Sequence, residues 1–220
     1  AIGTGWAGSL TMGVGQFCTN PGVVIVPDAL ADAFVAAAQD ALTQVAPAAM
    51  LTGGTAEGYR AGVTQTASHT GVMTCLSAGG TGREGGPALF VVSGADWLEN
   101  PDLAAEMFGP AGIVIRAADT DQVQQIAQAL HGQLTCTLQM DDADLDAARA
   151  LVPVLERKAG RLLVNAFPTG VEVADSMVHG GPFPASTNFG ATSVGTLAIR
   201  RFTRPICYQD MPQALLPQDL

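Results

Sequence analysis

The 220-residue sequence predicts an α/β protein with a mostly parallel open sheet flanked by helices. Three observations lead to this class. Short runs of β-branched and other apolar residues, typical of buried strands, recur between residues 23 and 165. Segments with helical periodicity separate most of these runs, which favours parallel strand pairing. The chain is also long enough to bury a core. Functional loops are therefore expected at the carboxyl ends of the strands.

The first part of the chain contains a helix, a strand and two further helices. Small residues around Trp6 favour a helix that leads into the loop of Cys18, and the β-branched run after this loop is typical of a buried strand. Asp28 begins a helix that Pro47 ends. The expected bounds are 1–15 for the first helix, 23–26 for the strand, and 28–45 and 55–70 for the further helices, with Leu30, Phe34, Ala37, Ala38 and Leu42 on the apolar face of the 28–45 helix.

The later part of the chain continues this alternation and ends in a long loop. Asp119 or Thr120 is expected to cap one helix, and Arg157 and Lys158 to stand near the end of the next, where the helix dipole favours positive charge. The expected strands are 72–77, 88–92, 111–116, 134–138 and 161–165, and the expected helices are 121–130 and 142–159. Gly, Pro, Ser and Thr then dominate residues 166–192, which predicts a loop that is either functional or disordered.

A glycine-rich loop at residues 78–87 contains the pattern G-x-G-x-x-G at Gly80, Gly82 and Gly85. A dinucleotide-binding fingerprint follows a strand and opens a helix. Here Pro87 and a strand follow the glycines, so the context argues against phosphate binding.

Composition and charge limit the partners of this protein. A net charge of −10 argues against a nucleic-acid backbone or an anionic membrane, whereas a small molecule or another protein surface fits. Charged residues make up only 14%, against about 25% in typical domains, which suggests that something else covers part of the surface. The first 27 residues are uncharged, but polar residues interrupt them and no basic segment precedes them. We therefore expect a cytoplasmic protein without a membrane span or signal peptide.

The four cysteines are widely spaced and form no C-x-x-C pair, so neither a metal site nor a disulfide framework is expected. Cys75, Cys136 and Cys207 lie in apolar or strand-like runs and are expected to be structural. Cys18 differs because glycines bound its loop, Gly15 on one side and Gly22 on the other. Loop chemistry alone leaves both an inert buried thiol and a catalytic cysteine open for Cys18.

Two motifs favour the catalytic interpretation. Residues 15–18, Gly-Gln-Phe-Cys, resemble the Gly-Gln-x-Cys nucleophile loop of the aldehyde dehydrogenase superfamily, and residues 106–110, Glu-Met-Phe-Gly-Pro, resemble its Glu-x-Phe-Gly-Pro signature. The resemblance implies that the Cys18 thiolate attacks an aldehyde, giving a thiohemiacetal and then a thioester. It also implies that Glu106 binds the ribose hydroxyls of NADP or NAD and that Phe108 supports the nicotinamide ring.

Two later segments resemble one branch of this superfamily, which contains 2-oxoglutarate semialdehyde (2,5-dioxovalerate) dehydrogenases and some fatty aldehyde dehydrogenases. They are residues 179–187, His-Gly-Gly-Pro-Phe-Pro-Ala-Ser-Thr, and residues 200–209, which resemble a terminal strand. The resemblance implies a catalytic domain over 1–193 and an oligomerisation strand and tail over 194–220, with the N-terminal dinucleotide-binding domain absent. The terminal strand is expected to pair with a neighbouring subunit of a homo-oligomer.

The resemblance also implies that this polypeptide alone does not oxidise a semialdehyde to the carboxylate. The general base, the oxyanion-binding Asn and the phosphate-binding domain of the family would precede Ala1, and all six glutamates of the chain follow Cys18. Loss of one oxyanion donor costs about 10²–10³ in rate, and loss of a general base about 10²–10⁴.

Two other functions remain open from the sequence. The chain can be a non-catalytic interaction module whose apolar face docks on another chain. It can also be a Cys–His hydrolase or acyl-transfer enzyme in which His69, His131 or His179 activates Cys18, although none of these histidines lies in a recognisable hydrolase motif.

Overall fold

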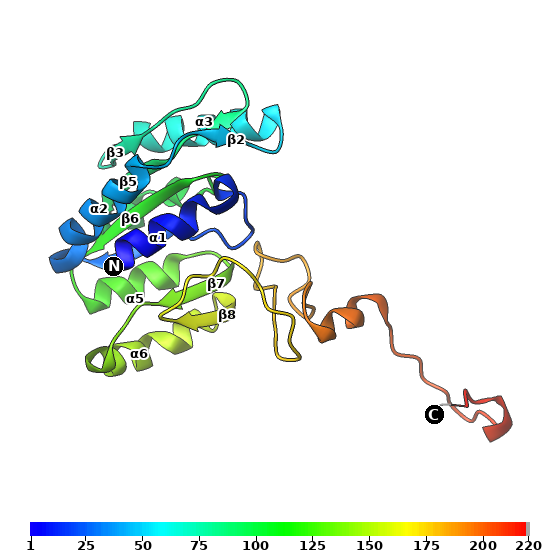
Figure 1. The fold of residues 1–220 in the computed structure, drawn as a ribbon. Coiled ribbons are helices and arrows are strands. Elements are labelled where there is room, and N and C mark those ends of the chain that lie inside the picture. The colour runs from blue at the N-terminus through cyan, green and yellow to red at the C-terminus, as the bar shows by residue number, and fades with distance from the viewer. Residues whose placement is uncertain (219–220) are drawn as a thin grey trace.

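A four-stranded sheet in the order β1-β6-β5-β3 forms the centre of the fold in a computed structural model that describes residues 1–218 (Figure 1). β1 (Val23–Pro27), β6 (Ala111–Ala117) and β5 (Ala88–Ser93) run parallel, and β3 (Met73–Ser77) pairs antiparallel with β5. The predicted α/β class with a mostly parallel sheet is confirmed. β3 is the exception because residues 78–87 lead back into β5 without the crossover helix that a parallel pair needs.

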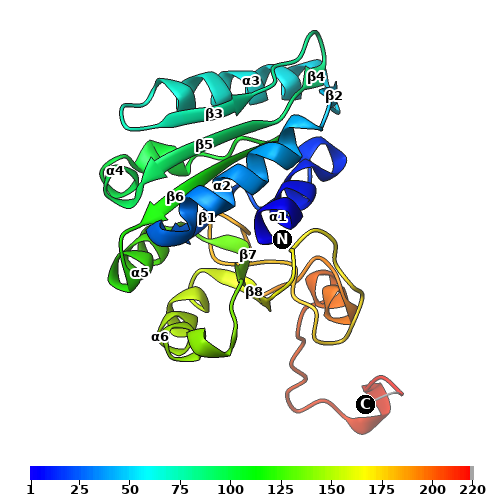
Figure 2. The ribbon, with the colours of Figure 1, turned by 60° about the vertical axis from the view of Figure 1, so that its left-hand side comes forward.

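Helices cover both faces of this sheet. They are α1 (Ile2–Thr11), α2 (Asp28–Thr43), α3 (Gly53–Ser68), α4 (Gly94–Glu99) and α5 (Thr120–Ala129). Side chains alternate along β5, so Leu89 and Val91 pack against α1 and α2, whereas Phe90 and Val92 pack against the helices of the opposite face. Figure 2 shows α2 lying across the sheet with α1 beside it. The two cores fix the position of α1, which leads into the Cys18 loop.

A second, two-stranded parallel sheet lies beside the first and carries the later part of the site (Figure 1). Its strands are β7 (Gln133–Leu138) and β8 (Ala159–Val164), joined through the short helix η3 (Asp142–Asp144) and α6 (Leu145–Leu155). Ala127 of α5 packs with Val154 and Leu155 of α6 to form a small third core. This core attaches the second sheet to the first.

Three expectations about these elements are wrong in detail. β1 is an edge strand that pairs only with β6 in the described chain, so Val26 is its one buried residue. Leu30 is 61% exposed, because α2 buries Ala31, Ala38 and Leu42 instead. The last helix ends at Leu155 rather than near residue 159. Lys158 therefore lies beyond α6, and its Nζ donates to the Leu130 carbonyl at the end of α5, at 2.6 Å.

Short elements that the sequence did not predict close the glycine-rich loop. β2 (Ala48–Ala49) pairs with β4 (Glu84–Gly85), and Arg60 of α3 donates to the carbonyls of Gly82 and Glu84 at 2.9 and 3.1 Å. The loop then enters β5 and not a helix. Its glycines therefore serve a tight hairpin-like connection.

The tail after residue 202 extends away from the two sheets (Figure 1). The terminal strand expected over 200–209 is not formed: residues 200–202 belong to the short helix η4 (Thr196–Phe202), and 203–209 have no regular secondary structure. A strand needs a ladder partner, and residues 1–218 supply none here. A last short helix, η5 (Gln213–Leu215), follows. None of the described helices is long and apolar enough to cross a membrane.

Candidate active site

Cys18 lies in a tight turn between the short helix η1 (Met12–Gly15) and β1. The Asn20 backbone N–H donates to the Phe17 carbonyl at 3.0 Å and closes the turn around Cys18. The cysteine is exposed and not disulfide-bonded. Its backbone N–H has no hydrogen-bond partner within residues 1–218. The thiol that the sequence singled out is therefore accessible, with a free N–H beside it.

Three consecutive residues before this turn have left-handed backbone angles. Gly13, Val14 and Gly15 have φ values of 58°, 57° and 66°. For a non-glycine residue this conformation costs about 1–2 kcal/mol, and Val14 is held in it while its side chain packs on the core. A Cβ at position 15 would collide with the Gly109 carbonyl, so the close approach of these two loops requires glycine there.

The Asn20 side chain joins the two sequence motifs. Its Nδ2 donates to the carbonyls of Leu10 at 3.0 Å, Gly15 at 2.8 Å and, more weakly, Gly109 at 3.4 Å. These carbonyls belong to the end of α1, to η1 and to the Glu-x-Phe-Gly-Pro segment. One carboxamide therefore holds the cysteine turn against the segment that carries Glu106 and Phe108.

Glu106 and Phe108 lie in the loop between the short helix η2 (Pro101–Ala104) and β6. Glu106 is exposed and makes no hydrogen bond within residues 1–218, and Phe108 is 40% exposed. Met107, between them, points inward, where its sulfur accepts a hydrogen bond from Thr66 Oγ1 at 3.3 Å. Because Met107 points inward while Glu106 and Phe108 are exposed, both oxygens of the Glu106 carboxylate are available to a pair of hydroxyl donors, which fits a ribose.

Of the three histidines that the sequence offered as partners of Cys18, His179 is the one that contacts it. The distance from Cys18 Sγ to His179 Nε2 is 3.1 Å, although the two residues are 161 positions apart. His69 and His131 follow α3 and α5 and make no hydrogen bond to Cys18 in the described chain. Of the three histidines only His179 lies in the segment over 179–187 that resembles one branch of the superfamily, but only the packing of the long loop could reveal its contact with Cys18.

The backbone of His179 is held on both sides. Its N–H donates to Thr192 Oγ1 at 2.8 Å, and its carbonyl accepts from the N–H and the hydroxyl of Ser193, both at 3.0 Å. The following glycines lie directly on the second sheet. A Cβ at Gly160 of β8 would collide with the Gly180 carbonyl, and one at Gly181 with the Gln133 carbonyl of β7.

Burial and charge favour the neutral form of His179. Burial lowers its pKa, and the positive charge of Arg161 lowers that pKa further. A neutral imidazole can accept the proton of a thiol. Burial instead raises the pKa of Cys75 and raises that of Cys136 to about 11, so these thiols stay protonated and unreactive. Cys207, expected to be structural, is exposed in the tail.

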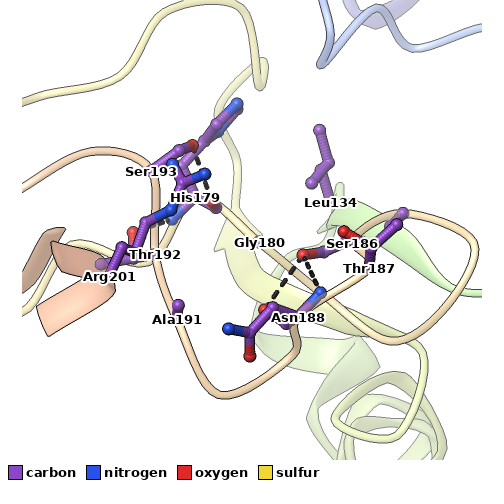
Figure 3. A pocket seen from close by; sticks show the side chains of 11 residues that line it. Leu134, His179, Gly180, Ser186, Thr187, Asn188, Ala191, Thr192, Ser193 and Arg201 are labelled. Carbon is purple, nitrogen blue, oxygen red and sulfur yellow. Dashed lines mark hydrogen bonds between the residues drawn. The ribbon is translucent and has the colours of Figure 1, made fainter. Parts of the chain in front are cut away.

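A cavity of about 190 Å³ adjoins His179 (Figure 3). Leu134 of β7 and residues between His179 and Arg201 line it, and no carboxylate is among them. Thr187 and Arg201 make no side-chain hydrogen bond or ion pair within residues 1–218, and the amide nitrogen of Asn188 is also free there. Hydroxyl, amide and guanidinium donors in one small cavity suit an anionic group.

Comparison with known proteins identifies the family. No family model matches the chain. Over its whole length, the chain is 52% identical to alpha-ketoglutaric semialdehyde dehydrogenase 2 of Azospirillum brasilense and covers 42% of that protein. The chain belongs to the aldehyde dehydrogenase superfamily. The resemblance that the two sequence motifs indicated is therefore confirmed.

Further comparisons agree with this assignment. Across 96% of its length the chain is 44% identical to alpha-ketoglutaric semialdehyde dehydrogenase of Acinetobacter baylyi and covers 41% of that protein. A crystal structure of an NAD-dependent aldehyde dehydrogenase from Sinorhizobium meliloti shares the fold, with a TM-score of 0.72 and 21% identity, over 92% of this chain and 40% of the other. The chain thus spans about two fifths of the length of the curated relatives it matches.

Proposed function

We propose that this aldehyde dehydrogenase chain supplies the nucleophile for NAD(P)-dependent aldehyde oxidation. The observation that carries the proposal is the 3.1 Å contact between the exposed Cys18 thiol and His179, on a turn that adjoins the Glu106 segment. The neutral His179 imidazole takes the thiol proton, and the thiolate adds to the aldehyde carbon. The free Cys18 N–H donates to the oxyanion that this addition creates.

Glu106 and Phe108 are the residues of this chain that would hold the cofactor, NADP or NAD. The exposed carboxylate would accept hydrogen bonds from the ribose hydroxyls, and the half-exposed phenyl ring would support the nicotinamide. When bound, this cofactor supplies a hydride acceptor. No residue of this chain has to perform the redox step itself.

The substrate we propose is a small aldehyde that also carries a carboxylate, the class that includes 2-oxoglutarate semialdehyde. The names of the two curated relatives support this class. The donor-lined cavity beside His179 supports it independently, since Arg201 is a free guanidinium there and carboxylates bind guanidinium groups bidentately. A carboxylate held in this cavity keeps the substrate close to the Cys18–His179 pair.

The activity of a longer protein containing this chain, its assembly and its domain division belong to the same proposal. We expect residues 1–193 to form the catalytic unit and residues 194–220 to pair with a neighbouring subunit in a homo-oligomer. The exposed apolar side chains of Phe202, Ile206 and Leu215 support this role for the tail. The 220-residue chain assayed alone is expected to give no aldehyde-dependent NAD(P)H formation, because all its glutamates follow Cys18 and the family's base is not among them.

Aldehyde protection of the thiol tests the proposal on the chain itself. 2-Oxoglutarate semialdehyde should slow iodoacetamide alkylation of Cys18, measured site by site with mass spectrometry, while Cys207 serves as an exposed control thiol. Arg201→Gln should weaken this protection, whereas Arg200→Gln, on the same short helix but outside the cavity, should not. In a longer protein that contains these residues, Cys18→Ser should abolish NAD(P)H formation. Equal protection of Cys18 and Cys207 would contradict the proposal.

The Cys18–His179 contact also supports a second candidate, a thiol hydrolase or acyl-transfer enzyme that needs no nicotinamide. This candidate predicts that the 220-residue chain hydrolyses p-nitrophenyl acetate with multiple turnovers, and that both Cys18→Ser and His179→Gln remove this activity. A single stoichiometric burst without turnover would favour the dehydrogenase, whose thioester step lacks a base in this chain.

A further inference from the structure

Arg161 of β8 contacts both ends of the loop that precedes His179. Its Nη2 donates to the Pro168 carbonyl at 2.8 Å, and its Nη1 donates to the Gly170 carbonyl at 3.2 Å. The same Nη1 lies 3.8 Å from the sulfur of Met177, two residues before His179. A single guanidinium therefore spans the loop from its entry to its exit.

A few other contacts also hold this loop, residues 166–178. It contains no helix or strand. Phe167 packs on the core beside Gly5 of α1. Side-chain hydrogen bonds join Thr169 to Ser9 of α1, Asp175 to Thr196, and the Ala166 carbonyl to Gln139. Ordering such a segment costs conformational entropy, which interactions have to offset. Arginine suits this task because its planar fork places several N–H donors at fixed angles.

We propose that Arg161 is a positioning residue for the Cys18–His179 pair. By joining the two ends of the 166–178 loop to β8, it holds the His179 ring against the thiol. The contacts of Arg161 and of His179 do not depend on the proposed function. Only the catalytic role of the Cys18–His179 pair rests on the proposed function. Arg161 touches neither the thiol nor the proposed cofactor residues in the described chain, so its effect passes through His179.

The charge of Arg161 also affects the His179 ring. Within residues 1–218, the titratable or charged groups that approach His179 are Cys18 from the turn, Arg161 from β8, and Arg201 from η4 across the shared cavity. No carboxylate stands among them. The positive charge of Arg161 disfavours a second positive charge on the ring, which lowers the pKa of His179 and keeps the resting ring neutral. The same charge opposes the imidazolium that forms when the ring takes the thiol proton, so the positioning role rests on the hydrogen bonds of the guanidinium and not on its charge.

The pH profile of Cys18 alkylation tests this proposal without aldehyde or cofactor. The 220-residue chain and its variants are treated with iodoacetamide between pH 5.5 and 9.5, and mass spectrometry reports each cysteine separately. Arg161→Gln should slow Cys18 at pH 7 by about tenfold or more, toward the rate of an unassisted thiol. Arg161→Lys keeps the charge but not the fork, and should give an intermediate rate. The rate of Cys207 should stay constant in every variant.

Two controls separate positioning from general damage to the fold. Arg60→Gln removes another guanidinium that binds two loop carbonyls but makes no hydrogen bond to Cys18 or His179 in the described chain, and it should leave the Cys18 profile unchanged. Thermal unfolding by circular dichroism checks that each variant is folded. In a His179→Gln background, Arg161→Gln should add no further slowing, because a residue that acts through His179 has nothing left to position.

The outcomes distinguish this inference from the proposed function. If His179→Gln slows Cys18 but a folded Arg161→Gln does not, the pair stands and the role of Arg161 is refuted. The role is equally refuted if Arg161→Lys reacts at the full rate, or if Arg161→Gln slows Cys18 as much without His179 as with it. If His179→Gln does not change the Cys18 alkylation rate, both the role of His179 as the base and the role of Arg161 are refuted.

Discussion

The thiol side and the imidazole side of the candidate site are held by different means. The Cys18 turn is braced mainly by nearby backbone, because Asn20 reaches carbonyls of Leu10 and Gly15 as well as Gly109. His179 instead follows a loop without regular secondary structure, and contacts from distant elements hold it in place. Changes on the thiol side should therefore act mostly on stability, and changes on the imidazole side mostly on reactivity.

The largest effect is expected from Gly160→Ala, which acts on the imidazole side. The added methyl group collides with the Gly180 carbonyl, so the segment after His179 has to move and the Cys18–His179 contact is lost. Cys18 alkylation at pH 7 should fall by about tenfold or more, toward an unassisted thiol, with a stability cost of about 1–3 kcal/mol in urea unfolding. Gly58→Ala, on an exposed part of α3 with open space around it, is the matched control and should change neither quantity adversely. If Gly160→Ala kept the native alkylation rate of Cys18, the imidazole side would not control thiol reactivity.

Asn20→Ala, on the thiol side, should lower stability more than thiol reactivity. The substitution leaves carbonyls of three segments without their donor, which should cost about 1–3 kcal/mol in the free energy of unfolding. Urea titration measures this cost. Asn100→Ala, which removes one carboxamide hydrogen bond from the residue after α4 to the Asp96 carbonyl, should cost less. In the folded variant the alkylation rate of Cys18 should change less than in Gly160→Ala. If the Cys18 alkylation rate fell as far as in Gly160→Ala, the thiol side would depend on distant contacts as much as the imidazole side does.

The pH dependence of stability isolates the His179 ring. Because its pKa is lowered in the native state, the unfolded chain binds more protons below the ordinary histidine pKa of about 6.5. The stability that comes from holding the His179 ring neutral is therefore fully present above about pH 6.5, and it is lost as the pH falls from 6.5 toward the pKa of His179 in the native state. Urea unfolding at pH 7.5 and pH 5.5 should show a smaller loss for His179→Gln than for the unchanged chain. Equal losses in both proteins would contradict the burial of a neutral imidazole.

The smallest effect concerns the strained valine on the thiol side. Val14→Gly loses core contacts but relieves about 1–2 kcal/mol of left-handed strain. Val24→Gly, in β1 with similarly partial burial, loses contacts without such relief. The first substitution should therefore cost about 1–2 kcal/mol less than the second in urea unfolding. Equal costs would mean that Val14 carries no strain.

The sequence predicted most elements of this fold to within a few residues, because hydrophobic period and turn residues act locally. Asp119 caps α5, as one of the two residues expected there, by accepting from the Gln122 N–H. The predictions that failed concern which part of an element the rest of the fold buries or pairs. The apolar run of β1 does not reveal that it stands at the sheet edge, and the apolar face assigned to α2 does not reveal that Leu30 is exposed while Ala31 is buried. The tail forms no strand because strand formation depends on a partner and not on its own residues.

The sequence by itself determined the family, the thiol and the segment that adjoins it, because each motif is a short stretch whose glycines and polar groups act on their immediate neighbours. Only the tertiary structure decided which of the three histidines meets Cys18 and that Arg161 holds the loop before it. The contact between residues 18 and 179 depends on how two sheets and a loop without regular secondary structure pack together, and no local pattern encodes that packing.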